Sequence, residues 1–340
     1  MEDFKSVKKW NKYHEGDLSN HSFLITGGAG FIGSNIVSYL VQHNAGKIKV
    51  LDNLSNGHIK NIQEYFDYPG FEFIEGDITN YETCCESVKD IEFISHQAAL
   101  GSVPRSIENP MQSAEVNILG TLNLMYASIQ MKIDRVVLAF SSSTYGDHPD
   151  LPKVEHEIGN PLSPYAVTKA SIEQFADVFG NTYNLKWIGL RYFNVFGPKQ
   201  NPNNPYAAVI PIFAKAFLTD GTISINGDGH NSRDFTYVDN IIKLNELSLF
   251  VENKEALNQG YNAACGGRVS LREMVAIMQR ITGKDINMTF APERVGDVKH
   301  SMASIKKASD LLGYKPVVRF EEGLQRTMTW YNENLNNLKE

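Results

Sequence analysis

The sequence predicts an α/β protein with a doubly wound parallel sheet and a smaller mixed α/β lobe towards its C-terminus. Short runs of β-branched and aromatic residues alternate with helix-length stretches, a glycine-rich turn follows the first run, and the alternation stops near residue 198. Parallel sheets of this kind bind ligands at the carboxyl ends of their strands. The predicted strands are 22–26, 47–51, 71–74, 91–95, 135–140 and 187–191.

Size and charge narrow the class of protein. With 340 residues, 42% of them hydrophobic and 21% charged, the chain is long enough for about two domains with a large core. This composition excludes disordered, collagen-like and small disulfide-bonded proteins. The formal net charge of −7 offers no basic surface for nucleic acid or an anionic membrane, so we expect a small-molecule partner.

Neither the N-terminus nor the cysteines suggest export or metal binding. No apolar run approaches the roughly 18 residues of a membrane helix, and the first twenty residues lack the apolar core of a secretion signal. We therefore expect a soluble cytoplasmic protein. Cys84, Cys85 and Cys265 are odd in number and lack metal-ligand spacing, which predicts reduced thiols and no metal site.

The first predicted strand leads directly into a glycine-rich turn and a helix. The turn reads Gly28-Ala29-Gly30-Phe31-Ile32-Gly33, and Gly27 adds a second spacing with Gly30 and Gly33. The following residues Ile36, Val37, Leu40 and Val41 have helical spacing. Without side chains, such a turn brings backbone N–H groups and the helix N-terminus to a pyrophosphate, whose charge the helix dipole favours. The context predicts a dinucleotide site.

An acidic residue follows at the distance that a dinucleotide site requires. Asp52 ends the second predicted strand, nineteen residues after Gly33, where a carboxylate meets the adenosine ribose hydroxyls. A carboxylate there would repel a 2′-phosphate, so NAD is favoured over NADP. Asp77 follows the third strand, and the sequence leaves open whether it caps a loop or touches the adenine.

A predicted helix start carries a tyrosine and a lysine on one face. Ser163 and Pro164 suit the N-cap and first turn, and Tyr165 and Lys169 are four residues apart. A tyrosine titrates near 10, and an adjacent ammonium is expected to lower this pKa by stabilising the phenolate. The run Ser141-Ser142-Ser143-Thr144-Tyr145-Gly146 ends the preceding strand, where hydroxyls could bond a substrate oxygen beside the phenol or satisfy their own backbone.

Together these motifs resemble the extended short-chain dehydrogenase/reductase superfamily, specifically its nucleotide-sugar epimerases. The resemblance covers the chain from about His21 to Tyr331 and includes Leu190-Arg191-Tyr192-Phe193-Asn194-Val195-Phe196-Gly197, Arg233-Asp234-Phe235 and Arg294-Val295-Gly296-Asp297. The stretches 96–106 and 141–169 look closest to bacterial UDP-N-acetylglucosamine 4-epimerases. The resemblance implies a Rossmann-type NAD-binding domain over 21–197, to which the chain returns around 236–262, and a UDP-sugar domain over 198–235 and 263–335.

The resemblance also implies a mechanism and a set of site residues. Tyr165 removes the 4-hydroxyl proton while hydride passes from C4 to tightly held NAD, and the 4-keto sugar rotates and takes the hydride back on its other face. The hydroxyl partner is one of Ser141, Ser142 and Ser143, of which we favour Ser142 and Ser143. The implied NAD contacts are Gly27, Gly30, Phe31, Ile32, Gly33, Asp52, Asn53, Asp77, Ile78, Gln97, Ala98, Ala99, Asn117, Tyr165, Lys169 and Tyr192. The implied UDP-sugar contacts are Gly101, Ser102, Ser141, Ser142, Ser143, Tyr165, Asn194, Val209, Asn226, Arg233, Arg294, Asp297 and Ser301.

Two departures from galactose-type epimerases bear on the substrate. Ser301 stands where those enzymes typically have a bulky tyrosine, which leaves room for an N-acetyl group at C2. Gly101 stands where a lysine is common, which leaves Lys169 as the cation near the cofactor ring. We therefore expect reversible C4 epimerisation of UDP-N-acetylglucosamine and UDP-N-acetylgalactosamine for surface polysaccharide precursors.

Three other interpretations stay open, and one is disfavoured. The chain could act on UDP-uronic acids, on UDP-glucose and UDP-galactose, or be a non-catalytic NAD sensor that would need neither Tyr165 nor Lys169. A 4,6-dehydratase usually carries an Asp-Glu pair where this chain has Ser142, Ser143 and Thr144, so dehydration is disfavoured. The family also implies a homodimer, in which helices near 112–130 and 164–183 form a four-helix bundle.

Overall fold

A single parallel sheet organises the chain. The computed structural model describes residues 10–292 and 298–334. The seven strands run in the order β3-β2-β1-β4-β5-β6-β11, and every neighbouring pair is parallel. The order of the first six is that of a Rossmann fold, which reverses between β1 and β4. The strands are β1 (Ser22–Thr26), β2 (Lys47–Asp52), β3 (Phe71–Glu75), β4 (Phe93–His96), β5 (Arg135–Ser141), β6 (Trp187–Tyr192) and β11 (Gln259–Ala263).

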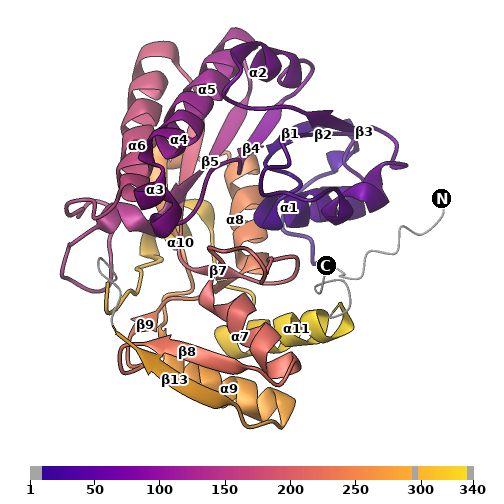
Figure 1. Ribbon diagram of the computed structural model, residues 1–340. Helices are drawn as coiled ribbons and strands as arrows, with labels where there is room; N and C mark the ends of the chain where they lie inside the picture. The colour runs from indigo at the N-terminus through magenta and orange to yellow at the C-terminus, as the bar shows by residue number, and fades with distance from the viewer. Residues whose placement is uncertain (1–9, 293–297, 335–340) are drawn as a thin grey trace.

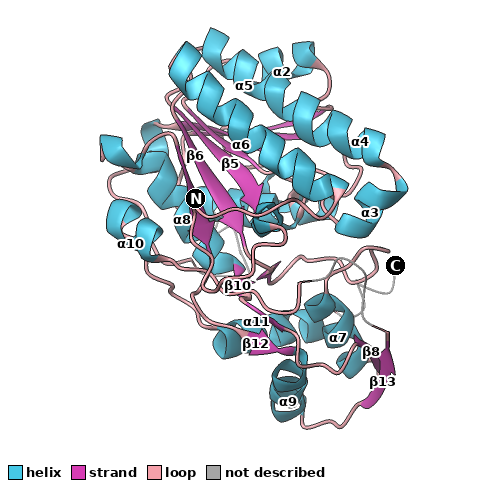
Figure 2. Cartoon of the chain, turned by 90° about the vertical axis from the view of Figure 1, so that its left-hand side faces the viewer, coloured by secondary structure: helices cyan, strands magenta, loops and turns pink. Residues whose placement is uncertain are grey.

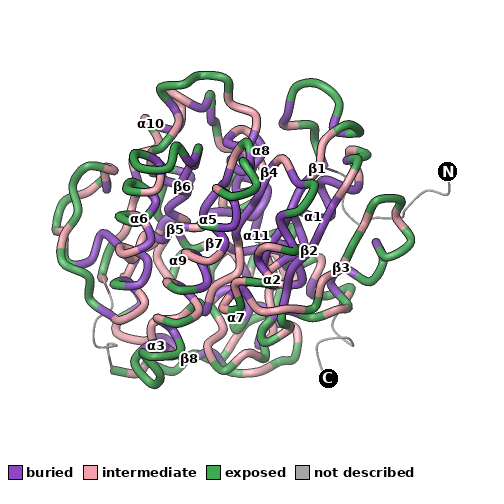
Figure 3. Tube along the Cα trace, turned by 90° about the horizontal axis from the view of Figure 1, so that it is seen from above, coloured by how far each residue is buried: buried purple, intermediate pink, exposed green. Residues whose placement is uncertain are grey.

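Helices cover both faces of this sheet. Side chains of β1 alternate, so that Phe23 and Ile25 join the core under α1 and α8 while Leu24 joins the core under α2, α5 and α6. Figure 2 shows the layer of α2, α5 and α6 lying over the strands. Figure 3 shows the sheet as the buried centre of the molecule. The helices are α1 (Phe31–Gln42), α2 (Tyr81–Ser87), α3 (Val103–Glu108), α4 (Pro110–Ala114), α5 (Thr121–Gln130), α6 (Pro164–Tyr183), α8 (Val238–Phe250) and α10 (Lys306–Leu312).

A second group of elements lies below the sheet in Figure 1. It contains a parallel strand pair, β8 with β13, an antiparallel pair, β9 with β12, and three helices. Its position agrees with the expected smaller lobe, and the division into an NAD domain and a UDP-sugar domain stays a prediction. The elements are α7 (Val209–Leu218), β8 (Thr222–Asn226), β9 (Ser232–Arg233), β12 (Val269–Ser270), α9 (Leu271–Thr282), β13 (Asn287–Ala291) and α11 (Phe320–Glu333), with the connecting pair β7 (Val195–Phe196) and β10 (Thr236–Tyr237).

The α/β fold class is confirmed, and several details differ from the sequence prediction. Strand β4 begins at Phe93 instead of residue 91, and a seventh strand, β11, was not among the predicted strands. The expected helix over 112–130 is divided by a wide π-helical turn (Glu115–Gly120) between α4 and α5. Among the described residues, no helix is long and apolar enough to cross a membrane.

Candidate active site

The glycine turn lies at the carboxyl end of β1 and is closely packed. Gly27 has φ +67°, and a Cβ atom there would lie 2.7 Å from the backbone N of Ala98. A Cβ atom on Gly33 would lie 2.2 Å from the carbonyl oxygen of Gly27. Gly30 precedes α1 and has no side chain to cap it, so N–H groups of the first turn stay available to a ligand. The turn therefore has the close backbone packing and the free helix N-terminus that the predicted pyrophosphate site requires.

A cavity of about 560 Å³ opens beside this turn, a volume ordinary for a small-molecule site. It runs from the glycine turn and Asp52 to Tyr165 and Lys169. The predicted cofactor-binding residues and the predicted catalytic residues therefore line one cavity. The predicted site residues that line it are Gly27, Gly30, Phe31, Ile32, Gly33, Asp52, Asn53, Ile78, Gln97, Ala98, Ala99, Gly101, Ser102, Ser141, Tyr165, Lys169, Tyr192 and Asn194.

Asp52 joins the end of β2 to the glycine turn. Its carboxylate accepts hydrogen bonds from the backbone N of Ala29 (2.9 Å) and of Leu54 (2.8 Å). Burial raises its pKa, and these bonds oppose the rise. The carboxylate therefore fixes the turn and also faces the cavity, where it suits ribose hydroxyls better than a phosphate.

Two predicted cofactor contacts do not line the cavity. Asp77 accepts hydrogen bonds from the backbone N of Thr79 and from Asn53 Nδ2 (2.6 Å), so it caps its own loop, the first of its two alternatives. Asn117 is buried in the π-helical turn, where its side chain pairs with both backbone groups of Leu100 and donates to Thr168. Because all of these hydrogen bonds are made inside the protein, the Asn117 amide stabilises the segment around Leu100, which lines the cavity.

Tyr165 enters the cavity from the first turn of α6. The hydroxyl of Ser163 caps this helix by accepting from Ala166 N, as predicted, and Tyr165 N donates to Ser106 Oγ on α3 (3.0 Å). Lys169 is buried with its Nζ 5.9 Å from the centre of the Tyr165 ring. That Nζ donates to the carbonyl oxygen of Ala139 on β5 (2.7 Å). The sheet thus fixes the Lys169 side chain, and α3 fixes the backbone from which Tyr165 projects.

The expected fall in the phenol pKa does not occur in this structure. Burial raises the pKa of Tyr165, and only the Ser141 hydroxyl acts in the opposite direction. Burial also lowers the pKa of Lys169 to about 8, against the attraction of Glu173. Since the ammonium points to Ala139 instead of the phenol oxygen, removal of both groups from water outweighs their mutual attraction.

Of the three candidate serines, Ser141 lies in the cavity. It ends β5, its side chain lines the cavity, and it is the hydroxyl that stabilises the Tyr165 phenolate. Ser142 and Ser143 begin a 3₁₀ turn (Ser142–Tyr145) that leaves the cavity wall, and Ser143 Oγ donates to Ser141 Oγ (2.9 Å). The preference for Ser142 and Ser143 therefore lacks support from this geometry, which favours Ser141.

A second cavity of about 310 Å³ adjoins the first and shares Asn194, Val195, Ala207 and Ala208 with it. Four predicted substrate residues line it, namely Asn194, Val209, Asn226 and Arg233. Ser301 lines neither cavity. Its N–H donates to Ser232 O (3.0 Å), and its Oγ is buried without a hydrogen-bond partner in the described part of the chain. Arg294 and Asp297 lie outside the described residues.

Several lining residues were missed by the sequence prediction. Lys199 donates to the carbonyl oxygen of Asn61 (2.8 Å), and Arg105 stacks 4.8 Å from the Tyr206 ring centre and donates to Asn56 (2.8 Å). Single charged residues in predicted loops carry no motif. The available signal was position alone, since Lys199 follows closely on Gly197 and Arg105 lies within the stretch 96–106, both of which the resemblance had already marked.

Comparison with known proteins identifies the family. A family model described as GDP-mannose 4,6 dehydratase matches residues 24–327. The chain belongs to this family of extended short-chain dehydrogenases/reductases. The solved structures similar to this chain include UDP-sugar 4-epimerases and a dTDP-glucose 4,6-dehydratase.

Three relatives in this family are informative. The UDP-glucuronate 4-epimerase of Thermodesulfobacterium geofontis is 33% identical, with 93% of this chain and 98% of that protein covered. The UDP-N-acetylglucosamine 4-epimerase of Methanobrevibacter ruminantium M1, solved with UDP-N-acetylmuramic acid, is 38% identical with a TM-score of 0.87, covering 92% of this chain and 99% of that one. The UDP-glucose 4-epimerase of Thermus thermophilus, solved with NAD, is 34% identical with a TM-score of 0.82, covering 91% and 98%.

These findings confirm the fold and agree with NAD as the cofactor of the family. The GDP-mannose 4,6-dehydratase family therefore unites chains that perform related chemistry on different sugar nucleotides. Membership alone does not select the sugar, which has to be argued from the cavity.

Proposed function

We propose that this chain is an NAD-dependent 4-epimerase that interconverts UDP-N-acetylglucosamine and UDP-N-acetylgalactosamine, for the synthesis of surface polysaccharide precursors. The observation that carries this proposal is one continuous cavity lined by the glycine turn, Asp52, Ser141, Tyr165 and Lys169. The 38% identity to a UDP-N-acetylglucosamine 4-epimerase supports the acetylated sugar.

The cavity residues fit NAD by shape and charge. The glycine turn and the start of α1 would hold the pyrophosphate, and Asp52 would hold the ribose. Tyr192 donates to Gln97 Oε1 (3.0 Å), so these two side chains form a fixed part of the cavity wall. When bound, NAD supplies a reversible hydride acceptor for C4 of the sugar.

The chain itself performs the proton chemistry. Tyr165 takes the proton of the 4-hydroxyl and later returns it, while the Ser141 hydroxyl bonds the same sugar oxygen. Lys169, anchored on Ala139, keeps positive charge beside the phenol when protonated. The second cavity would hold UDP, with Arg233 near the diphosphate, because a guanidinium binds two oxygens at once.

Dehydration stays disfavoured despite the family description. Of the described residues that line the main cavity, Asp52 alone is acidic, and it stands beside the glycine turn, away from Tyr165. A dehydratase needs an acid and a base next to the sugar, and Ser142 and Ser143 offer neither.

The function is tested by product analysis. Purified protein is incubated without added cofactor with UDP-glucose, UDP-galactose, their N-acetyl forms and UDP-glucuronate, and the products are separated. We expect the fastest turnover with the acetylated pair and no release of free NADH. Faster turnover of UDP-glucuronate or of the plain pair would reassign the substrate, and no turnover of any sugar would overturn the epimerase.

Substitution of Ser301 by tyrosine is expected to change the choice of sugar. Ser301 lines neither cavity but is bonded to Ser232, next to Arg233 of the second cavity. We propose that a bulky ring at position 301 would extend into the space of the N-acetyl group, so turnover of the acetylated pair should fall at least about tenfold while the plain pair is retained. The measurement is kcat/KM for each UDP-sugar. Thr219→Tyr, at an exposed position after α7, is the control and should change neither value.

We also propose a homodimer formed by α5 and α6. Large apolar side chains on these helices are exposed in the isolated chain, among them Tyr126 (44%), Val167 (49%), Phe175 (38%) and Val178 (54%). Val178→Glu is expected to give monomers in sedimentation equilibrium. Val317→Glu, exposed to 37% outside these helices, should stay dimeric. A wild-type protein that sediments as a monomer would contradict the dimer.

A further inference from the structure

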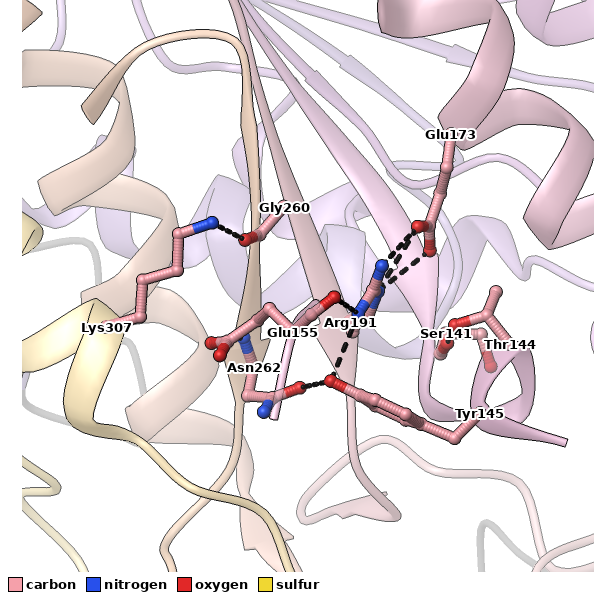
Figure 4. Close-up of polar contacts among 9 residues, drawn as sticks. All are labelled: Ser141, Thr144, Tyr145, Glu155, Glu173, Arg191, Gly260, Asn262 and Lys307. Carbon is pink, nitrogen blue, oxygen red and sulfur yellow. Dashed lines mark hydrogen bonds and ion pairs between the residues drawn. The ribbon is translucent and has the colours of Figure 1, made fainter. Parts of the chain in front are cut away.

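A buried ion pair lies one turn beyond Lys169 on α6. Glu173 follows Lys169 by four residues, so Tyr165, Lys169 and Glu173 lie along one face of the helix. Its carboxylate accepts from Arg191 on β6, with Nη2 at 2.6 Å and Nε at 3.1 and 3.2 Å from the two oxygens. The two side chains are 13% and 5% exposed. Figure 4 shows the guanidinium of Arg191 turned towards Glu173.

The same guanidinium reaches the turn that follows the proposed catalytic serine. Arg191 Nη1 donates to Tyr145 Oη (3.1 Å) and to the carbonyl oxygen of Glu155 (2.9 Å), and Tyr145 Oη donates to Asn262 Oδ1 (2.6 Å). Arg191 therefore ties α6 to the Ser142–Tyr145 turn and to β11. Figure 4 shows the hydroxyl of Tyr145 pointing towards Arg191 and Asn262.

Thr144 completes the connection. Its Oγ1 donates to the carbonyl oxygen of Ser141 (2.8 Å), which bonds the turn back to the end of β5. Through Arg191, the Glu173 carboxylate on the helix that carries Tyr165 is thus linked to the turn that follows Ser141. A displacement of Glu173 would change the distance between the two proposed proton-handling hydroxyls.

The charges around Lys169 give Glu173 a second role. The titratable groups that act on Lys169 in the described structure are Tyr165 and Glu173 on its own helix and His96 on β4, and Arg191 on β6 is paired with Glu173. Burial lowers the pKa of His96 to about 3, so His96 is neutral. Burial raises the pKa of Glu173, and Arg191 opposes that rise. The carboxylate is thus the anion that keeps Lys169 cationic.

We propose that Glu173 and Arg191 are positioning residues for the proton transfer: together they hold the Ser141 turn against α6, and the Glu173 carboxylate maintains the charge of Lys169. This inference rests on the proposed function, which assigns the proton transfer to Tyr165, Ser141 and Lys169. Neither residue lines either cavity, so both act through these neighbours.

The test measures Lys169 directly as well as activity. Lysines are ¹³C-methylated, the Lys169 signal is assigned with Lys169→Arg, and its titration is followed by NMR in the wild type, Glu173→Gln and Glu173→Asp. Loss of the carboxylate in Glu173→Gln is expected to move the Lys169 midpoint down by about one pH unit, while Glu173→Asp keeps it near the wild-type value. For Glu173→Gln we expect kcat to fall about tenfold, with KM and NAD content retained.

Controls separate this role from stability. Glu321→Gln removes a carboxylate from an exposed pair with Arg280 (2.7 Å) and should change neither the midpoint nor kcat. If Glu173→Gln does not fold, as judged by thermal melting, the double variant Glu173→Gln/Arg191→Met, which removes both buried charges, tests the anchoring role instead: kcat should still fall with NAD content retained, and a wild-type kcat would overturn that role.

The outcomes distinguish this inference from the function itself. A folded Glu173→Gln variant with an unchanged Lys169 midpoint and unchanged kcat overturns the positioning role. If the wild type epimerises none of the UDP-sugars but the midpoint moves as expected, the proposed function fails, while the effect of Glu173 on Lys169 is supported.

Discussion

Replacement of Tyr165 by phenylalanine is expected to lower kcat for epimerisation by about 10²–10⁴-fold, the usual contribution of a positioned acid–base group. The substitution removes one oxygen and keeps the ring that lines the cavity, so bound NAD should be retained. Turnover is measured by separating the UDP-sugars, and the NAD content is measured after denaturation. A sensor without catalysis would show no change in either value.

The matched control for this substitution lies on the same helix. Tyr183→Phe removes the same atom from the exposed end of α6, where the side chain is 49% exposed, and should keep the wild-type kcat. If Tyr165→Phe turned over as fast as Tyr183→Phe, another group would have to move the proton, and the proposed mechanism would be wrong.

The pH dependence of the wild type follows from the two pKa changes. Because burial raises the pKa of Tyr165, the phenolate fraction increases with pH throughout the neutral range. Burial lowers the pKa of Lys169 to about 8, so the lysine charge is lost above that value. We expect kcat to rise with pH up to about pH 8 and then to level off. Tyr165→Phe should abolish this rise.

The sequence predicted the parts of the molecule that depend on local chemistry. The glycine turn, the acid at the end of β2 and the Ser163 cap each need particular residues at short spacing, and all three were placed correctly. Strand β11 was not predicted because Gly260 and Asn262 are poor strand formers. It pairs with β6 because tertiary packing overrides that preference.

Features that depend on distant contacts could not be predicted. The choice among Ser141, Ser142 and Ser143 follows from where β5 ends and the 3₁₀ turn begins, which spacing cannot fix. Asn117 fell outside the cavity because a π-helical turn directs it to Leu100. The pKa of Tyr165 was predicted in the wrong direction, since the sequence shows the neighbouring lysine but not the burial of both groups.

Replacement of Gly33 by alanine is expected to have the second large effect, on binding of the cofactor. The added methyl carbon would lie 2.2 Å from the carbonyl oxygen of Gly27 and 2.7 Å from the Cα of Gly28. Both neighbours are backbone atoms of the turn, so they can give way only if the turn moves. Such overpacking typically costs about 1–3 kcal/mol of unfolding free energy.

Gly101 supplies the control because it lines the same cavity but has open space around it. No heavy atom lies within 4 Å of a Cβ atom built there, so Gly101→Ala should bind NAD as the wild type does. For Gly33→Ala we expect NAD affinity at least about tenfold weaker by calorimetry, because displacement of the turn misdirects the N–H groups at the start of α1. Equal NAD affinity in Gly33→Ala and Gly101→Ala would mean that the pyrophosphate does not rest on this turn. The assignment of the cavity to a dinucleotide would then lose its main support, whatever the kcat of Tyr165→Phe.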